Sequence, residues 1–131
     1  MYLITTIHKA HQAVRDVFND VSEGGPTPTQ LIVLAALAER EYTTQGELCR
    51  ATGVDRSTMT DVISRLVRLH YVTRKQLRRD ARVKTPRITP RGRGVVNHAM
   101  LSVPRIEAEL QARMPELRSL RTTAPKIKKA A

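Results

Sequence analysis

The stretch that decides the fold runs from Thr43 to Arg93 and reads TTQGELCRATGVDRSTMTDVISRLVRLHYVTRKQLRRDARVKTPRITPRGR. It begins with a predicted helix whose capping box, Thr44-x-x-Glu47, would let each side chain satisfy a backbone N–H of the other residue. Gly53 marks the end of that helix, because glycine accepts the left-handed conformation of a helix end. Asp55 is a favourable N-cap for a second helix. So short a gap between two helices predicts a helix-turn-helix.

The second helix is predicted from about Arg56 to His70, and its two faces differ in chemistry. Apolar residues at helical spacing predict a buried stripe, which consists of Met59, Val62, Ile63, Leu66, Val67 and Leu69. Short hydrogen-bonding and cationic side chains occupy the other positions, most of them in the first turns. In a helix-turn-helix, that N-terminal part of the second helix contacts base edges in the major groove.

A basic β-hairpin is predicted after this helix. Tyr71 to Thr73 favours a strand, and Val83 to Ile88 favours a returning strand. Most residues between them are cationic, as a wing that follows the minor groove or the DNA backbone requires. Pro86 lacks a backbone N–H, so it must face outward on an edge strand or mark an irregular position. Together these elements predict a winged helix-turn-helix.

Charge is concentrated in the same stretch. The 131 residues carry a net charge of +11, of which residues 55–93 contribute +9, whereas residues 1–54 sum to −2. A charge confined mainly to the predicted second helix and wing is typical of a nucleic-acid footprint, and a solvated basic face is the alternative. Cys49 is the only cysteine, which excludes an intrachain disulfide. The N-terminus does not resemble a secretory signal, and no apolar run approaches the roughly 18 residues of a membrane span, so we expect a cytoplasmic protein.

The two ends of the chain are predicted to be amphipathic helices. One covers Leu3 to Val21, and another continues an apolar stripe after the wing as far as Met114, with a kink at Pro104. Between the first helix and the helix-turn-helix, Thr27, Pro28 and Gln30 predict a capped start for a buried central helix. The terminal stripes have no partner within one chain, which favours a homodimer. We therefore predict one domain, 1–131, with dimerisation helices at 1–22 and 94–121, a winged lobe at 27–93 and a disordered basic tail at 122–131.

Three motifs resemble the MarR family of bacterial transcription regulators. Asp80-x-Arg82, followed after five residues by Ile88-Thr89-Pro90-x-Gly92, is similar to the wing signature of that family, with isoleucine in place of leucine. Val54 to Thr60 resembles the opening of the family's recognition helix, and Thr27 to Leu31 extends the similarity upstream. The resemblance implies a mainly α fold with a small antiparallel β-hairpin, a homodimer and binding to double-stranded DNA.

Candidate DNA contacts follow from the motif and the resemblance: Thr44, Gln45, Arg56, Ser57, Thr58, Thr60, Arg65, Arg78, Arg79, Arg82 and Lys84. The resemblance implies that Arg82 enters the minor groove and that Asp80 orients it through a charge-assisted bond; a solvated loop arginine is the alternative. Arg78 and Arg79 are expected at phosphates. The N–H groups that open the helix at Thr44 and Gln45 can bind a phosphate, and the helix side chains can face bases or phosphates.

Relatives are often released from DNA by small aromatic acids, so the resemblance suggests an effector site with His11, Arg15 and His98 as polar contacts. We predict no metal and no cofactor, because the pair His8 and His11 lacks further ligands nearby in sequence and His70 and His98 lie elsewhere. Cys49 is interpreted as a buried structural thiol, with a redox switch as the alternative. Motifs of catalytic chemistry are absent from the sequence, so we do not expect an enzyme.

The predicted function is that of a homodimeric, sequence-specific transcriptional regulator, a repressor that binds a near-palindromic operator. One alternative is a nonspecific architectural DNA-binding protein, which the basic charge allows but the polar second helix disfavours. Another is a winged-helix module that binds proteins, in which we would expect the wing to have lost its arginines.

Overall fold

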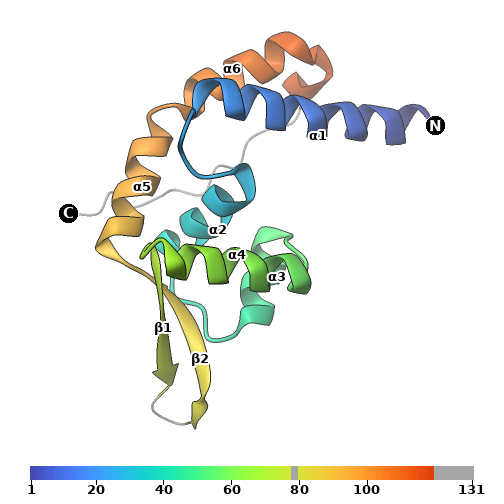
Figure 1. The fold of residues 1–131 in the computed structure, drawn as a ribbon. Helices are drawn as coiled ribbons and strands as arrows, with labels where there is room; N and C mark the ends of the chain where they lie inside the picture. The colour runs from blue at the N-terminus through green and yellow to red at the C-terminus, as the bar shows by residue number, and fades with distance from the viewer. Residues whose placement is uncertain (78–79, 120–131) are drawn as a thin grey trace.

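A computed structural model describes residues 1–77 and 80–119, and the side chains of residues 1–76 and 84–118. It confirms a mainly helical fold with a two-stranded antiparallel hairpin (Figure 1). The elements, in chain order, are α1 (Tyr2–Val21), α2 (Pro28–Glu39), α3 (Gln45–Thr52), α4 (Arg56–Arg68), β1 (Val72–Leu77), β2 (Asp80–Ile88), α5 (Pro90–Met100), α6 (Val103–Arg113) and the 3-10 helix η1 (Pro115–Ser119). None of the helices in these ranges is long and apolar enough to cross a membrane.

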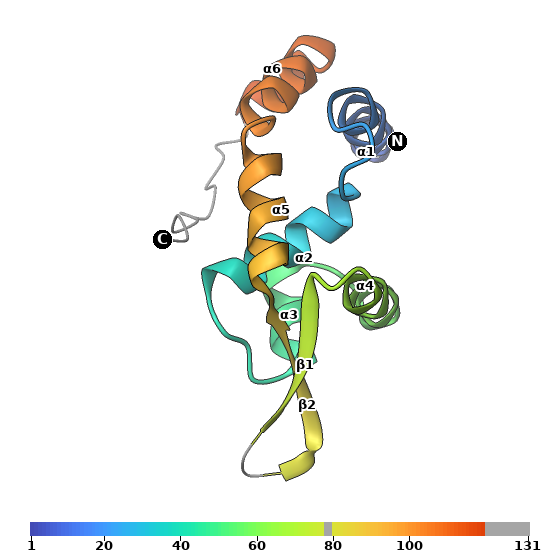
Figure 2. The ribbon, with the colours of Figure 1, turned by 60° about the vertical axis from the view of Figure 1, so that its left-hand side comes forward.

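Helix α2 is the central strut that the sequence predicts. It starts with a complete capping box: the hydroxyl of Thr27 accepts from the N–H of Gln30, whose side chain accepts from the N–H of Thr27. The helix contacts α1, α3, α4, α5 and β2. Figure 2 shows it between α5 on one side and α4 on the other, with α1 and α6 together at the far end from the hairpin. The winged lobe is thus built around α2.

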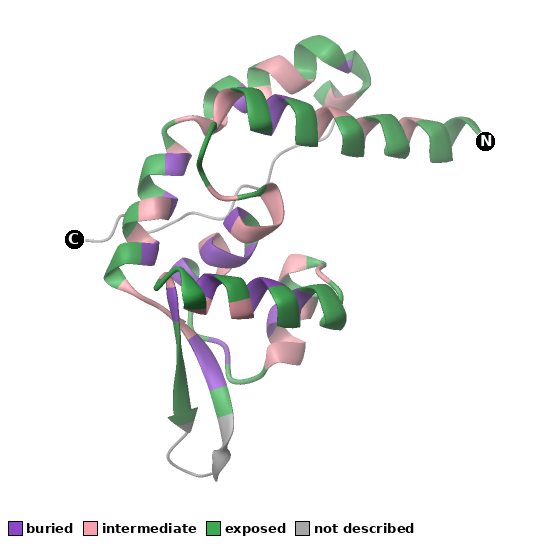
Figure 3. Ribbon diagram, in the orientation of Figure 1, coloured by how far each residue is buried: buried purple, intermediate pink, exposed green. Residues whose placement is uncertain are grey.

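One hydrophobic core joins the lobe to the terminal helices. Its fully buried side chains come from five helices and a strand, and they include Val17, Val33, Leu34, Leu48, Met59, Leu66, Val72 and Val96. Figure 3 shows the buried positions in α2 and on one face of α4, whereas the N-terminal half of α1 is exposed. The buried face of α4 holds Met59, Val62, Ile63 and Leu66 as predicted.

The turn between α3 and α4 forms as the sequence predicts. Gly53 adopts φ 74° at the end of α3, and the Asp55 carboxylate accepts from the N–H of Thr58 at 2.8 Å.

The capping box of α3 is only half formed, which corrects the prediction. The Thr44 hydroxyl accepts from the N–H of Glu47, but the Glu47 carboxylate accepts from the N–H and hydroxyl of Thr43. The Thr43 hydroxyl adds a second donor, and this explains why the carboxylate binds one residue further upstream.

Helix α4 ends earlier than predicted, at Arg68 instead of His70. The N–H of Tyr71 donates to the Leu66 carbonyl and the N–H of His70 to the Val67 carbonyl, which is a Schellman motif with His70 at φ 61°. The prediction that Leu69 belongs to the buried stripe was wrong. Leu69 is 44% exposed, because the chain leaves the helix at this residue and turns towards β1.

Replacing His70 with glycine should stabilise the protein by about 0.5–1 kcal/mol, because the left-handed conformation costs an L-residue free energy that glycine does not lose. Thermal unfolding by circular dichroism would measure the change. Gly53→Ala is the matched control in the opposite direction: its φ is also positive and an added Cβ meets nothing within 4 Å, so only backbone strain is introduced. A lower melting temperature for His70→Gly would contradict the argument.

The segment Thr89 to Gly92 locks the start of α5 onto the end of α4. The Thr89 hydroxyl accepts from the N–H of Gly92 and donates to the carbonyl of His70 at 2.7 Å, and the N–H of Thr89 donates to the carbonyl of Tyr71. The backbone of Gly92 passes so close that a Cβ there would lie 2.2 Å from the Tyr71 carbonyl oxygen. Threonine and glycine at these two positions therefore join the end of α4, the wing and α5.

The long C-terminal helix of the prediction is two helices. Helix α5 ends at Met100 and α6 begins at Val103, with Leu101 and Ser102 in a turn whose N–H groups bond to carbonyls three residues back. Pro104 does not kink a continuous helix, which corrects the prediction. It lies in the first turn of α6, where its missing N–H costs least. The predicted tail, 122–131, lies outside the described residues.

The hairpin pairs Val72 with Ile88 at its base and Gln76 with Lys84 further out, and the register shifts between Gln76 and Leu77. Pro86 is buried and lies opposite Arg74, where the register does not shift, so the position is not the irregular one of the prediction and β2 is an edge strand. A sheet of two strands leaves each strand with one side free of ladder bonds, and this accommodates the missing N–H.

Candidate nucleic-acid interface

The face of α4 opposite the core carries the predicted polar residues. Five of them are exposed, namely Arg56, Ser57, Thr58, Thr60 and Arg65, while Met59 and Val62 between them are buried. This separation follows from the helical period, since residues three and four apart share a face. The solvent face of α4 therefore presents hydroxyls and guanidinium groups. Figure 1 shows the C-terminal end of α4 next to the wing and its N-terminal end beside α3.

Some of these side chains are occupied within the lobe. Gln45 Nε2 donates to the Thr60 hydroxyl at 2.9 Å, which ties α3 to α4, and that hydroxyl donates to the Arg56 carbonyl. The Thr58 hydroxyl donates to Asp55. In contrast, Arg56, Ser57 and Arg65 have no side-chain hydrogen bond or ion pair among the described residues. The structure thus brings the predicted residues together but divides them into braced and available side chains.

A depression of about 480 Å³ opens between the first turns of α3 and α4, and Gln45, Arg56, Ser57 and Thr60 line it. Both helices direct N-terminal backbone N–H groups to this region, so their dipoles favour an anion there. Thr44 is exposed at the same end of α3. The geometry suits a phosphate at the position that the sequence predicts.

The wing side of the interface is described in part. Lys84 is exposed in β2, and Arg74 of β1 donates to the Ser64 hydroxyl of α4 at 3.2 Å. Asp80 and Arg82 belong to β2, but their side chains are not described, so the predicted bond between them stays a prediction. The predicted contacts Arg78 and Arg79 lie outside the described residues.

The cap of α4 makes the interface sensitive to acid. The N–H of Thr58 and, to a smaller extent, its hydroxyl donate hydrogen bonds to the Asp55 carboxylate. These bonds hold the pKa of this carboxyl below its ordinary 3.8. A carboxyl whose pKa is lowered by folding stabilises the protein above its unfolded pKa, and this contribution is lost as the pH falls through the folded pKa. Asp55→Asn keeps a capping oxygen that does not titrate, so its melting temperature should fall less steeply below about pH 4. Equal slopes in a pH series of thermal melts would contradict this.

A second hollow of about 540 Å³ lies between the α1–α2 loop and α5. Its walls come from the α1–α2 loop, the end of α4 and α5, and its polar side chains include Gln30, Arg91, His98 and Ser102. The Arg91 guanidinium lies 5.7 Å from the ring centroid of Tyr71. Of the predicted effector contacts, His98 lines this hollow, whereas His11 and Arg15 are exposed on α1 and do not.

Sequence reasoning missed Arg91, although one signal was present. Arg91 and Arg93 lie in the first turn of α5, where a cation opposes the helix dipole and is therefore unexpected without another role. Arg93 Nη1 donates to the Ala38 carbonyl at the end of α2, and Arg91 lines the hollow. The partners of both residues are far away in sequence, so the local pattern could not identify them.

The other singled-out residues have ordinary surroundings. His8 and His11 are exposed on α1, and within the described ranges no group of three or more histidine, cysteine, aspartate or glutamate side chains is placed to hold a metal ion. Cys49 is a half-buried free thiol that packs against the core. This environment is that of a small packing residue.

Solved structures of similar fold include several bacterial regulators. A probable transcriptional regulator from Pseudomonas aeruginosa is 26% identical, with a TM-score of 0.77 and 88% of each chain covered. The regulator MOSR from Mycobacterium tuberculosis, solved with DNA, is 26% identical with a TM-score of 0.73, covering 90% of this chain and 88% of MOSR. PcaV from Streptomyces coelicolor, solved with its natural ligand, is 28% identical with a TM-score of 0.74, covering 82% and 77%. None of the curated proteins matches the sequence.

The family model that matches this sequence is that of the MarR family, over residues 25–83. Over these residues the chain is similar to the MarR family. The matched segment begins just before α2, contains the helix-turn-helix and reaches into β2. Gly92 lies beyond the matched segment, and the Tyr71 carbonyl leaves no room for a Cβ at that position.

Proposed function

We propose that this protein regulates transcription by binding a specific double-stranded DNA sequence through the N-terminal half of α4 and the β1–β2 wing, and that it acts as a repressor. The observation that carries the proposal is the set Arg56, Ser57 and Arg65, which are exposed and unpaired among the described residues, on a helix that the Gln45–Thr60 bond ties to α3. Such a helix can meet the major groove without rearrangement. MOSR, a relative with 26% identity, was solved in complex with DNA, which supports the same role here.

The proposed binding unit is a homodimer. The start of α1 exposes four apolar side chains, Tyr2 at 79%, Leu3 at 70%, Ile4 at 66% and Ile7 at 61%, and Leu101 in the α5–α6 turn is 78% exposed. A patch of this kind on a soluble protein favours burial by a partner. A twofold axis would place two α4 helices about 34 Å apart, one turn of DNA, and would favour a near-palindromic operator. Sedimentation of a monomer at micromolar concentration would contradict the dimer.

Fluorescence anisotropy tests the function. A duplex from upstream of the protein's own gene is titrated beside a scrambled duplex of equal length at physiological salt, with Arg56→Ala, Arg82→Ala and the control Arg105→Ala. Arg105 is exposed on α6, away from the proposed interface, so its loss removes the same charge without a predicted contact. We expect preference for the upstream duplex, reduced in the first two variants only. Equal binding to both duplexes, and to duplexes that tile the neighbouring genes, would favour the architectural alternative.

We further propose that a small aromatic acid binds the hollow between the α1–α2 loop and α5, and that its binding weakens the binding of DNA. Arg91 and His98 can pair with a carboxylate, and Tyr71 and Val95 can contact a ring. PcaV was solved with a natural ligand, which is consistent with this site. Salicylate is a suitable probe: it should raise the melting temperature of the parent protein but not of Arg91→Ala. The proposal fails if a panel of aromatic acids changes neither the melting temperature nor the DNA affinity.

A further inference from the structure

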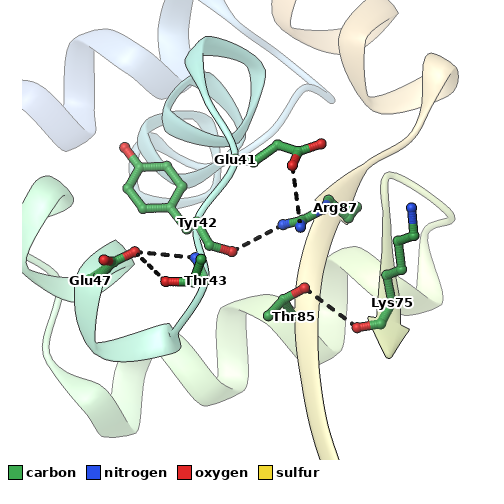
Figure 4. A network of polar contacts seen from close by, with 7 residues as sticks. All are labelled: Glu41, Tyr42, Thr43, Glu47, Lys75, Thr85 and Arg87. Atoms are coloured by element: carbon green, nitrogen blue, oxygen red, sulfur yellow. Dashed lines mark hydrogen bonds and ion pairs between the residues drawn. The ribbon is translucent and has the colours of Figure 1, made fainter. Parts of the chain in front are cut away.

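The linker between α2 and α3, residues 40–44, is bound by a side chain of the wing. Arg87 of β2 donates from Nη1 to the Tyr42 carbonyl oxygen at 3.0 Å, and its Nη2 lies 3.4 Å from Glu41 Oε2 (Figure 4). The acceptor is itself held in place. The Tyr42 side chain is 3% exposed in the core, and the Arg40 guanidinium covers its ring at 4.1 Å. The root of the wing is therefore fixed to a linker residue that cannot easily move.

The next linker residue, Thr43, is bound by a side chain of α3. The N–H and hydroxyl of Thr43 donate to Glu47 Oε2 at 3.1 and 3.0 Å, and these bonds lower the pKa of Glu47. Like any glutamate at neutral pH the side chain is ionised, so it is a strong acceptor for these two donors. Two adjacent residues thus connect the wing to α3: Tyr42 receives the bond from β2, and Thr43 donates the bonds to α3.

Most contacts of the Arg87 side chain contribute little to the stability of the fold. Glu41 is 80% exposed at its side chain, so the ion pair is worth little. Arg87 Nε is buried and, within the part of the chain that the structure describes, has no hydrogen-bond partner. Burying an N–H without an acceptor costs free energy. The remaining well-formed contact is the directional bond to the Tyr42 carbonyl, which joins segments 45 residues apart.

We propose that Arg87 is a positioning residue, which sets the place of the wing relative to α3 by holding the Tyr42 carbonyl. Its effect on DNA binding rests on the proposed function: the wing and the α3–α4 pair contact one duplex together, so the distance between them must match the DNA. The exposed bond between Arg74 and Ser64 is a second link from the wing, but to α4 and not to α3.

Electron paramagnetic resonance measures this distance without DNA. Spin labels are attached at Ala51→Cys on α3 and Lys75→Cys on β1, both exposed positions, in a Cys49→Ala background. Labelled protein is diluted with unlabelled protein so that only distances within one chain are recorded. Arg87→Met keeps the apolar stem of the side chain and removes all of its hydrogen-bond donors. We expect the distribution of distances between the two labels to be wider in this variant than in the parent. Arg87→Lys keeps the charge but not the planar fork, and should give an intermediate width.

Arg93→Met is the matched control. Arg93 also donates from Nη1 to a backbone carbonyl, that of Ala38 at 3.2 Å, but it links α5 to α2 and not the wing to α3. Its loss should leave the distribution unchanged. Equal widths in the parent and both Arg87 variants would overturn the proposal, as would equal widening in Arg93→Met, which would indicate general loosening.

Anisotropy with the upstream duplex separates this inference from the proposed function. Arg87→Met should bind about tenfold more weakly, because the wing must then be ordered at the moment of binding. Arg93→Met should bind as the parent does. If the parent shows no preference for any duplex, the proposed function fails while the distance measurement still decides the role of Arg87. If the distribution widens but affinity is unchanged, the claimed effect of Arg87 on DNA binding is overturned.

Discussion

Gly92→Ala is expected to destabilise the protein by about 3 kcal/mol or more, which should lower the melting temperature by on the order of 10 °C. The added Cβ would lie 2.2 Å from the Tyr71 carbonyl oxygen and 2.9 Å from Ile88 Cγ1. The first of these atoms belongs to the backbone, which also accepts the N–H of Thr89, so it cannot move away without breaking that bond. Alanine gains about 1 kcal/mol over glycine inside a helix, and the clash outweighs this gain.

Gly94→Ala is the control for this prediction. Gly94 lies two residues further along α5, and an added Cβ there meets nothing within 4 Å. Only the helix preference changes at this site, so the variant should be more stable than the parent by up to about 1 kcal/mol. Thermal and urea unfolding would measure both variants. A Gly92→Ala protein as stable as the parent would show that α5 can move away from the α4–β1 junction.

DNA affinity should fall by about 10³ to 10⁵ between 50 and 200 mM salt, if 6–10 phosphates are contacted. The expectation follows from the net charge of +9 in residues 55–93 and from the helix ends that open on the depression lined by Gln45 and Arg56. Each neutralised phosphate releases counterions, and added salt opposes that release. Anisotropy titrations of the upstream duplex at five or more salt concentrations would give the slope of log affinity against log salt.

Arg56→Gln tests one contact within that slope. The Arg56 side chain is exposed and unpaired among the described residues, so its replacement should leave the fold intact. If Arg56 binds a phosphate, the slope should decrease in magnitude by about 0.9 and the loss should be similar for all sequences. A larger loss on the upstream duplex alone would assign Arg56 to base contacts. A flat salt response of the parent would contradict the electrostatic basis of the proposed function.

Local signals in the sequence predicted most of the helix starts and the sites where the chain turns. Thr27 with Gln30, Gly53 and Asp55 all cap helices as expected. Each cap involves groups within three or four residues, so the pattern and the interaction occupy the same short segment. The buried stripe of α4 was predictable for the same reason, because its period is a property of the helix itself.

Two of the errors concern where a helix ends. Leu69 continues the apolar stripe of α4, yet the bonds from Tyr71 and Thr89 pull the chain out of the helix before it. The apolar stripe of the C-terminal segment continues across Leu101 and Ser102, although the two helices there are separate. Periodicity reports which residues are apolar, but it does not report where the backbone turns.

By itself, the sequence determined the winged helix-turn-helix, its polar helix face and the concentration of positive charge, since these depend on neighbours along the chain. Only the tertiary structure decided the roles of the arginines. Arg74 braces α4, Arg87 holds the α2–α3 linker and Arg93 caps α2, while Arg56 and Arg65 have no partner among the described residues. These side chains are chemically identical, and a guanidinium finds its acceptor through the fold, up to 55 residues away along the chain. No local pattern can therefore distinguish a DNA contact from a structural bond.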